Sequence, residues 1–317
     1  MIYEIRTDRP HQESFFRQQR NFIMLKNTRL WAWLRKKKAE HTAATNPELQ
    51  SRKIFLSTFG REPDLDQPKS FNEKLQYLKL KRYYHNPVIT QCVDKYRIRE
   101  YLTQKGHAEL LPQLYAVCER PEDIPWDSLP ERFVLKCNHG SGYNILCRNK
   151  SALDRKDCES RLKKWLKEDY WKRFAEMQYR DIPKRIIAEE YLGDDIHTYK
   201  FYCFNGMPRV LYISSNGENG EYDKYYDYFD MDWKHMNLRL HGHENRPDHD
   251  AIPCPESFER MKALAAELSA DFPFVRVDLY DINGRIYISE LTFVPTGGIM
   301  VLDPPSTDME WGGWLSL

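Results

Sequence analysis

Alternating hydrophobic and polar residues between Phe274 and Phe293 predict a β-hairpin. Two runs rich in Val, Ile, Tyr and Phe are separated by Asp281-Ile282-Asn283-Gly284, a segment typical of a tight turn. The alternation places five apolar residues on one face, which we expect to be core: Val275, Val277, Leu279, Leu291 and Phe293.

The other face of the first strand carries Arg276 and Asp278, and the register decides whether Glu290 of the second strand joins them. A plain two-residue Asn-Gly turn would pair Asp278 with Ser289 and bury Glu290 among apolar side chains, at a large cost in free energy. A three-residue loop ending at Gly284, in the left-handed bulge position, would pair Arg276 with Glu290 and set Asp278 diagonally beside them. We therefore predict the bulged turn.

Two carboxylates and an arginine on the exposed face of one hairpin suit an Mg²⁺ ion held between protein and phosphate oxygens. Magnesium takes few protein ligands, usually one or two carboxylates, and completes its shell with phosphates and water. From the hairpin alone, a cross-strand salt bridge on a solvated sheet is an equally good interpretation.

Helical spacing of apolar residues predicts several helices. The first runs from Lys69 to Leu80, where Ser70 can cap the N-terminus and Glu73 follows three residues later. Further segments with helical spacing are Val88–Gly106, which contains Lys95, Ser151–Trp171 and Ser257–Ala270.

A strand, a glycine-containing loop and a second strand follow one another from Phe133 to Cys147. The loop, Asn138 to Asn144, lacks the G-K-[ST] signature and leads into no helix, so it is not a Walker A motif. It can fold down as a flap whose backbone N–H groups face phosphate oxygens, with Lys136 adding a positive charge. The alternative is an ordinary hairpin with a Gly-Ser-Gly turn.

The segment Arg185–Leu192 reads as a short strand that ends in paired acids and leads into Gly193-Asp194-Asp195. Its edge could present backbone groups to an adenine and a carboxylate to a ribose, although an ordinary core strand with solvated acids fits equally well. Tyr199–Phe204 is the next predicted strand, and Lys200 on its polar side is expected to point into a cleft.

A long polar excursion, Ser214 to Asp250, contains a hairpin candidate, Tyr225 to Trp233, and four histidines: His235, His241, His243 and His249. None of their spacings fits a common zinc site, so a substrate-covering loop is the better interpretation. Farther along, Val294 to Gly298 forms a turn whose backbone could cradle a carboxylate.

The segment Phe15–Lys38 contains eight Lys and Arg residues and no Asp or Glu, together with Trp31 and Trp33. A basic amphipathic helix of this kind can lie on an anionic bilayer. The alternative is a helix docked on its own protein with the basic face in water. The following segment, His41–Gln50, is expected to be a linker.

The composition of the 317 residues limits the classes of protein to which the chain can belong. With 41% hydrophobic residues and a net charge of +1, the chain can form a sizeable core in two or three lobes, and nothing in its charge favours nucleic acid. Seven cysteines without a C-x-x-C pair favour a reducing cytosol over a disulfide framework. With no 18-residue apolar run and no signal peptide, we expect a cytoplasmic protein that contacts the inner membrane face through Phe15–Lys38.

Taken together and in this order, the motifs resemble the ATP-grasp superfamily, and most closely its TupA-like branch, named for teichuronopeptide biosynthesis. The resemblance covers roughly Lys69 to Val294. The residues that carry it are Phe71-Asn-Glu-Lys-Leu-Gln-Tyr-Leu-Lys, Asp94-Lys-Tyr, Phe133-Val-Leu-Lys-Cys-Asn-His-Gly-Ser-Gly, Ile187-Ala-Glu-Glu-Tyr-Leu, Tyr199-Lys-Phe-Tyr-Cys-Phe-Asn-Gly, Phe272-Pro-Phe-Val-Arg-Val-Asp-Leu-Tyr and Glu290-Leu-Thr-Phe.

The resemblance implies an α+β fold in which two α+β subdomains grip a nucleotide, preceded by a helical N-terminal region. The expected divisions are a basic segment at 1–45, a helical region at 46–130, a subdomain with the flap and adenine hinge at 131–192, and a subdomain with the metal-binding hairpin at 193–317.

ATP and Mg²⁺ are the cofactors that the resemblance implies. Its implied ATP-binding residues are Lys95, Lys136, Asn138, His139, Gly140, Ser141, Gly142, Glu189, Glu190, Leu192, Asp194 and Asp195. Lys200 and Arg276 would face the transferred phosphoryl group, and the metal ligands would be Asp278, Glu290 and Thr292. Relatives such as D-alanine–D-alanine ligase have Asn where Thr292 stands, which puts a second Mg²⁺ in question. Substrate would meet Thr296, Gly297 and Gly298.

The function implied is an ATP-dependent carboxylate–amine ligase that forms an amide through an acyl phosphate. By analogy with the family, it would join an amino acid to a uronic acid or other sugar, with a lipid-linked saccharide as a candidate, in bacterial surface-polysaccharide (capsule) synthesis. The alternatives are an ATP-grasp phosphotransferase acting on a sugar and a non-catalytic saccharide-binding module.

Overall fold

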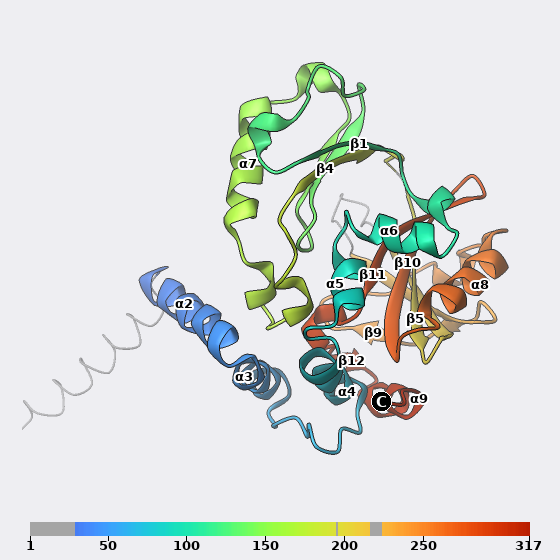
Figure 1. Ribbon diagram of the computed structural model, residues 1–317. Coiled ribbons are helices and arrows are strands. Elements are labelled where there is room, and N and C mark those ends of the chain that lie inside the picture. Colours follow the sequence, from blue (N-terminus) through green and yellow to red (C-terminus); the bar gives the residue numbers. More distant parts are fainter. Residues whose placement is uncertain (1–28, 195, 216–223) are drawn as a thin grey trace, which may run out of the picture.

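The computed structural model describes residues 29–194, 196–215 and 224–317. Two antiparallel sheets form two lobes, with helices α5 and α6 between them and α3, α4 and α9 (Ser306–Trp314) below them (Figure 1). The N-terminal helices are α2 (Arg29–Thr45), α3 (Pro47–Phe59), α4 (Phe71–Tyr77), α5 (Pro87–Val93) and α6 (Ile98–Gln104), and a π-helical turn, Leu78–Arg82, continues α4.

The smaller lobe is a four-stranded sheet with strand order β1-β4-β2-β3. The strands are β1 (Leu114–Cys118), β2 (Phe133–Cys137), β3 (Asn144–Cys147) and β4 (Ile186–Glu190). Helix α7 (Arg155–Lys167) covers one face of this sheet, where buried Cys158 and Leu162 join Phe133 and Leu135 in a separate core. This lobe carries the predicted flap and hinge.

The larger lobe is a six-stranded sheet with strand order β11-β10-β5-β6-β7-β8. Its strands are β5 (Thr198–Phe204), β6 (Met207–Ser215), β7 (Tyr225–Asp230), β8 (His235–Met236), β10 (Phe274–Ile282) and β11 (Arg285–Thr292). Helix α8 (Phe258–Ser269) packs on β5, β6 and β10 through Met261, Ala265 and Leu268, all fully buried. This core also takes in residues of α4 to α6, so these helices and the large sheet pack together.

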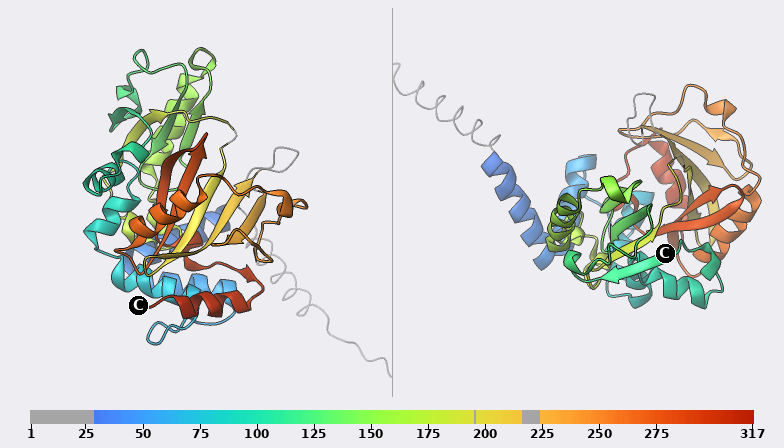
Figure 2. Two further views of the ribbon diagram at one scale, coloured as in Figure 1. Left: turned by 90° about the vertical axis from the view of Figure 1, so that its right-hand side faces the viewer. Right: turned by 90° about the horizontal axis from the view of Figure 1, so that it is seen from above.

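The last part of the chain closes against α4. It contains a short turn η8 (Pro295–Gly298), a strand β12 (Leu302–Asp303) that pairs with β9 (Arg239–Leu240), and α9 (Ser306–Trp314). Lys74 of α4 donates hydrogen bonds to the carbonyls of Gly312 and Leu315, at 2.8 and 2.6 Å. The left-hand view of Figure 2 shows α9 running beneath the sheets.

The hairpin of β10 and β11 has a different register from the predicted one. Ile282 pairs with Arg285, so the loop is the plain two-residue Asn-Gly turn, and the predicted three-residue loop is wrong. The register shifts instead within the strands, where Leu279 faces Ile288 and Asp278 faces Glu290, leaving an extra residue at Ser289. This bulge returns Glu290 to the polar face. Asp278, and not Arg276, is therefore its direct partner.

The apolar face of the hairpin is as predicted, because all five of the apolar residues named for it are at most 2% exposed. The polar face is not solvated, however. Asp278 is 0% exposed and Arg276 is also buried, so the expectation of an exposed polar face is wrong.

Two helix predictions also need correction. The predicted helix Val88–Gly106 is broken between α5 and α6, because the Asp94 carboxylate accepts hydrogen bonds from the backbone N–H groups of Tyr96 and Arg97 and turns the chain. The expected linker at His41–Gln50 is largely helical, because Asn46 ends α2 and caps α3 by accepting a hydrogen bond from Leu49. The predicted cap at Ser70, with its reciprocal Glu73, is confirmed.

Helix α2 projects from the body of the protein, as the right-hand view of Figure 2 shows. Only residues 29–38 of the predicted membrane-contacting segment Phe15–Lys38 fall within the described part of the chain. Across the described ranges, none of the helices has both the length and the apolar character needed to cross a membrane.

Candidate active site

Two cavities lie between the lobes and share three residues of their walls: Ser141, Lys200 and Glu290. The first has a volume of about 530 Å³ and is lined mainly by polar residues, which come from β2, β3 and the flap of the smaller lobe and from β5, β6, β10 and β11 of the larger one. The second, of about 560 Å³, has aromatic walls and lies on the other side of Lys200. Chemistry that involves two bound molecules can therefore take place where the cavities meet.

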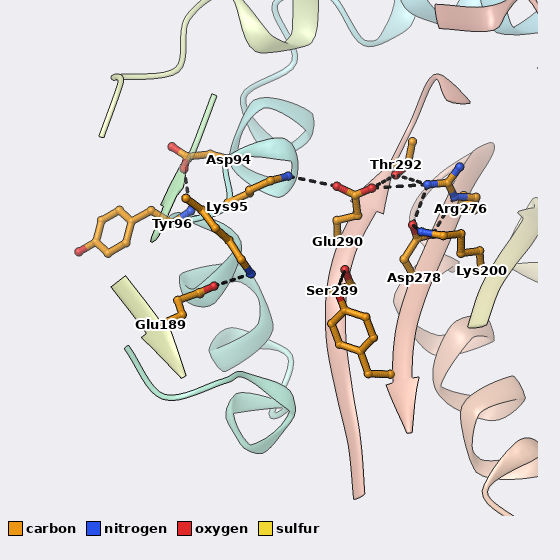
Figure 3. Close-up of polar contacts among 12 residues, drawn as sticks. Asp94, Lys95, Tyr96, Glu189, Lys200, Arg276, Asp278, Ser289, Glu290 and Thr292 are labelled. Atoms are coloured by element: carbon orange, nitrogen blue, oxygen red, sulfur yellow. Dashed lines mark hydrogen bonds and ion pairs between the residues drawn. The ribbon is translucent and has the colours of Figure 1, made fainter. Parts of the chain in front are cut away.

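Asp278, Arg276 and Lys200 form a charged group beside these cavities, on the strands β10 and β5 (Figure 3). Arg276 holds Asp278 with two hydrogen bonds of 2.7 Å, from Nε to Oδ1 and from Nη2 to Oδ2. Lys200 Nζ, on the neighbouring strand β5, lies 2.8 Å from Oδ2. Burial alone would lower the pKa of Lys200, but the Asp278 carboxylate raises it above its ordinary value. Lys200 therefore stays charged.

Glu290 connects the hairpin with the opposite side of the cleft. Its Oε2 lies 3.1 Å from Lys95 Nζ, and its Oε1 lies 3.5 Å from Arg276 Nη2 and accepts a hydrogen bond of 3.2 Å from Thr292. Burial alone would raise the pKa of Glu290, but the positive charges of Lys95, Lys200 and Arg276 hold it well below its ordinary value. The carboxylate is thus ionised at any physiological pH.

Lys136 points from β2 into the first cavity and pairs with Glu189 of β4, with Nζ 2.8 Å from Oε2. Burial alone would lower the pKa of Lys136, but Glu189 raises it above its ordinary value. A second cation, Arg99 of α6, donates a 2.8 Å hydrogen bond to Glu189. Glu189 is therefore occupied by two protein cations, and its side chain does not line either cavity.

The flap residues divide into two groups. Ser141 and Gly142 line the first cavity, and Gly142 has a positive φ of 79° that suits glycine at the tip. Asn138 and His139 are buried instead, with the Asn138 amide donating to Asp94 at 2.8 Å and the His139 Nε2 3.2 Å from the carbonyl of Trp165. Gly140 lies against Tyr170, whose ring leaves no room for a side chain there. Asn138, His139 and Gly140 thus hold the flap in position through buried contacts and do not line either cavity.

The predicted adenine hinge is not a sheet edge. Strand β4 lies between β1 and β2. The backbone N–H of Glu190 donates a hydrogen bond to the carbonyl of Gln113, and the Glu190 carboxylate accepts one from the N–H of Gln113. The backbone available to a ligand therefore begins after Glu190, near Leu192, and the edge interpretation is wrong because β1 covers that side. Asp194 does line the first cavity, where Arg148 and Arg132 contact it. Asp195 lies outside the described residues.

The family model described as TupA-like ATPgrasp matches residues 73–315. The chain belongs to the TupA-like ATPgrasp family. The match includes the sheets of both lobes, the flap and the hairpin of β10 and β11, so the expected α+β ATP-grasp fold is confirmed.

Solved structures similar to this TupA-like protein include two kinds of ligase. D-alanine–D-alanine ligase from Bacillus anthracis, complexed with ATP, is 17% identical over 65% of this chain and 54% of its own, with a TM-score of 0.38. L-amino acid ligase from Bacillus licheniformis is 15% identical over 80% of this chain and 57% of its own, with a TM-score of 0.45. The chain thus spans little more than half of each. No curated protein sequence matches it.

The carboxylates of the TupA-like protein fit a magnesium ion. Glu290 lines both cavities, Asp278 is its direct cross-strand partner, and both offer the carboxylate oxygens that Mg²⁺ prefers. Asp278 Oδ2 accepts hydrogen bonds from both Arg276 and Lys200, whereas Oδ1 accepts one from Arg276 alone, so Oδ1 is the oxygen with a lone pair left for a metal. Thr292 accepts from Arg276 and donates to Glu290, which is a supporting role.

The predicted substrate turn lies on the second cavity, where Thr296 and Gly297 form part of the wall. Thr296, Gly297 and Gly298 all have positive φ, between 51° and 76°, and side chains at the two glycines would collide with Phe174 and Gln76. Gln76 of α4 donates to the carbonyls of Gly297 and Gly298, which fixes the turn. The contact between α4 and η8 therefore shapes this cavity.

Part of the polar excursion also reaches the second cavity, through Tyr226, His241 and His243. Two other histidines, His235 and His249, come together with buried Asp227 within 4.8 Å, a proximity that the sequence spacing did not suggest. The two rings stack at 3.8 Å with an interplanar angle of 27°. Rings stacked in this way cannot both direct a lone pair at one ion about 2 Å away without turning.

Three charged residues of the site escaped prediction. Arg99 holds Glu189, and the buried pair Lys79 and Glu176 lies beside the second cavity. Lys79 has the most specific contacts, because its Nζ donates to the carbonyls of Phe174 and Gly297 at 2.8 and 3.1 Å. Each of them has other charged residues close by in the sequence, such as Arg97 and Glu100 beside Arg99, so no local pattern distinguished it from a solvated charge.

Proposed function

We propose that this protein is an ATP-dependent ligase that joins a carboxylate to an amine. The observation that supports it best is the meeting of the two cavities at Lys200 and Glu290. One cavity offers cations for a triphosphate, and the other offers room for an acceptor beside the same two residues. A nucleotide and an acceptor can therefore bind at once and react at the shared wall.

Phosphate recognition is assigned to the cations and the flap. Lys136 of the smaller lobe and Lys95 of the turn between α5 and α6 both line the first cavity, and Ser141 and Gly142 of the flap border it. Binding of phosphates would replace the carboxylate partners that these lysines hold in the free protein, Glu290 and Glu189. Asp278 and Glu290 would hold Mg²⁺, which supplies charge neutralisation and orientation of the phosphates.

The reaction proposed has two steps. A substrate carboxylate oxygen attacks the γ-phosphorus of ATP, the bond to the bridging oxygen breaks, and an acyl phosphate and ADP form. The amine then attacks the acyl carbon and expels phosphate, and the nitrogen loses its extra proton. Lys200 and Arg276 neutralise charge on the transferred phosphoryl group, which is the main demand that phosphoryl transfer places on a protein.

The identity of the substrates is proposed from family analogy. An amino acid would be joined to a uronic acid or another sugar in the synthesis of a bacterial surface polysaccharide. The aromatic walls of the second cavity, which include Tyr202, Tyr212 and Tyr226, suit an apolar sugar face. A lipid-linked saccharide would explain a membrane contact through Phe15–Lys38.

The test is product analysis with the full-length protein. It is incubated with ATP, Mg²⁺ and a panel of amino acids and uronic acids, singly and in pairs, and ADP and products are measured. A ligase gives ADP, phosphate and an amide that depends on both partners. A phosphorylated sugar without an amide would show a phosphotransferase instead. Sugar binding without any ADP would show a binding module.

A further inference from the structure

Glu176 is a buried carboxylate in the wall of the second cavity, outside the groups assigned to ATP and Mg²⁺. It lies immediately before the short helix η6 (Met177–Tyr179), and its residue is only 4% exposed. A carboxylate in such a place is costly unless it is paired or hydrogen-bonded. Its partners are therefore informative.

The other buried carboxylates of the site have donors. Glu189 is held by Lys136 and Arg99, and Asp278 by Arg276 and Lys200. Within the described ranges, by contrast, no group donates a hydrogen bond to the Glu176 carboxylate. The Glu176 carboxylate instead lies in the wall of the second cavity, where a molecule bound in that cavity can supply a donor.

The cations nearest to Glu176 are committed elsewhere. Lys79 gives its hydrogen bonds to the carbonyls of Phe174 and Gly297, and Arg173 gives one of 2.9 Å to Glu168. They act on Glu176 through their charge alone. Burial raises the pKa of Glu176 above its ordinary value and Glu290 raises it further, whereas Lys79 and Arg173 oppose this.

Two aromatic rings complete the surroundings. Tyr170 and Tyr179 also line the second cavity, with ring centroids 5.2 Å apart in an edge-to-face arrangement. Arg173 already lies over the Tyr170 ring, 5.0 Å from its centroid, so this part of the cavity wall accepts a cation on an aromatic face, and a carboxylate in the same wall can accept the hydrogen bonds of a second, organic cation. An ammonium group would supply both the charge and the donors that Glu176 lacks.

We propose that Glu176 binds the ammonium group of the amine substrate in the second cavity and accepts a proton from it. The inference rests on the proposed ligase function and places the amine partner at the Glu176 part of the second cavity, while Tyr202, Tyr212 and Tyr226 remain for the sugar. Glu290 and Lys200, in the wall shared by both cavities, then lie on the path between the bound amine and the acyl phosphate.

The chemistry requires this proton transfer, because an ammonium nitrogen has no lone pair. One proton passes from the ammonium to the Glu176 carboxylate, which becomes a carboxylic acid. The freed amine attacks the acyl carbon, the bond to the phosphate oxygen breaks, and the second nitrogen proton leaves with the departing phosphate. Glu176 returns its proton to water when the amide leaves.

An assay with hydroxylamine measures formation of the acyl phosphate separately from attack by the amine substrate. Hydroxylamine is largely unprotonated at neutral pH, so it attacks an acyl phosphate without help from a base and gives a hydroxamate. Full-length protein is supplied with ATP, Mg²⁺ and glucuronate, galacturonate or an amino acid as the carboxylate. The nucleophile is either hydroxylamine or an amino-acid methyl ester. The variants are Glu176→Gln, Glu176→Asp and the exposed control Glu256→Gln.

The expected result is a selective loss. Glu176→Gln forms hydroxamate at a rate similar to that of the wild type, but its rate of amide formation falls by about 100-fold or more, the usual contribution of a general base. Glu176→Asp recovers part of the amide rate because it restores the carboxylate, and Glu256→Gln behaves like the wild type in both assays.

Three outcomes would overturn the proposal. Amide formation at the wild-type rate in Glu176→Gln would show that the carboxylate is not used. Equal losses of hydroxamate and amide in both Glu176 variants, with a lowered Tm, would show that Glu176 only supports the fold. Phosphorylated sugar without hydroxamate in the wild type would instead remove the ligase function itself, and this result is recognisable because it does not depend on any variant.

Discussion

Lys95 and Glu290 form an ion pair 3.1 Å long across the cleft, although 195 residues separate them in the sequence. Lys95 belongs to the turn between α5 and α6, and Glu290 belongs to the bulged strand of the hairpin. A lysine assigned to phosphate and a carboxylate assigned to Mg²⁺ thus neutralise each other in the free protein (Figure 3). The phosphates of ATP are negative and Mg²⁺ is positive. A phosphate can therefore replace Glu290 beside Lys95, and Mg²⁺ can replace Lys95 beside Glu290.

Glu290→Gln and Asp278→Asn should both abolish turnover but should differ in stability. Glu290 is 28% exposed at its side chain, so its loss should cost less unfolding free energy than the loss of the fully buried Asp278. Asp278 is fully buried between Arg276 and Lys200, and its loss leaves two buried cations, at a cost of about 3–5 kcal/mol. ADP release and urea unfolding measure the two effects. Equal unfolding midpoints for the two variants would contradict the assignment of a buried charge centre.

Lys136→Ala should weaken ATP binding by about 1.5–3 kcal/mol, because it removes a cation that points into the first cavity. Arg99 remains on Glu189, so the fold should survive the change. Titration with a non-hydrolysable ATP analogue gives the affinity, and the exposed Lys53→Ala serves as the matched control. An affinity equal to that of the control would show that Lys136 supports the sheet and not the nucleotide.

His139 should make the protein less stable in mild acid. Burial first, and then the nearby Lys184, lower the pKa of His139 to about 4. The unfolded chain binds a proton below pH 6.5 and the folded chain does not until about pH 4, so stability falls as the pH drops through this range. The contribution is on the order of 2–3 kcal/mol, and it is absent above pH 6.5.

Urea unfolding at pH 7.5 and pH 4.5 measures this dependence. His139→Gln keeps a donor for the carbonyl of Trp165 but cannot titrate, so its stability should change less between the two pH values. The exposed His41→Gln provides the control. If His139→Gln loses as much stability between pH 7.5 and pH 4.5 as the wild type does, other groups cause the acid sensitivity.

The N-terminal segment should bind anionic vesicles through α2 and the residues before it. Leu30, Trp33 and Leu34 are 62%, 54% and 42% exposed, and Lys36, Lys37 and Lys38 are exposed beside them. Replacement of the three lysines by Gln should lower vesicle affinity by roughly 100-fold at low salt, since each contributes about 1 kcal/mol. Co-sedimentation with phosphatidylserine vesicles tests this.

The control for that experiment is a second set of exposed lysines on another helix, Lys163, Lys164 and Lys167 of α7. If both triple variants lose affinity equally, the effect is one of net charge and the segment is not a membrane contact. If neither loses affinity, the basic face of α2 simply faces water.

Local signals in the sequence were sufficient where a residue acts on its own neighbours. The cap at Ser70 and the strands on either side of the flap follow from residues a few positions apart. The break after α5 was missed because apolar spacing continues through it, while the turn depends on Asp94, whose carboxylate is held by Asn138. The sequence thus indicated both lysine-bearing segments but not the hydrogen bond that joins them.

The errors at the site have one physical cause, namely contacts between distant segments. Strand β4 is central because β1 pairs with it, and nothing near β4 in the sequence announces that partner. Glu176 was overlooked for the same reason: its significance comes from Lys79 and the second cavity. Arg276, Asp278, Glu290 and Thr292 lie on one face of the hairpin, as predicted. The predicted three-residue loop is wrong, because a bulge at Ser289 brings Glu290 to that face.

Because of the bulge at Ser289, the pairing of Asp278 with Glu290 does not depend on how many residues separate them in the sequence. On its turn side, Leu279 faces Ile288, and on its site side, Asp278 faces Glu290, with Ser289 as the extra residue between them. A chain lacking Ser289 would keep both sets of partners, because the regular pairing would then bring Glu290 directly after Ile288. One residue can therefore be gained or lost here without moving the carboxylates apart. Searches that demand a fixed number of residues between Asp278 and Glu290 would overlook proteins with the same site.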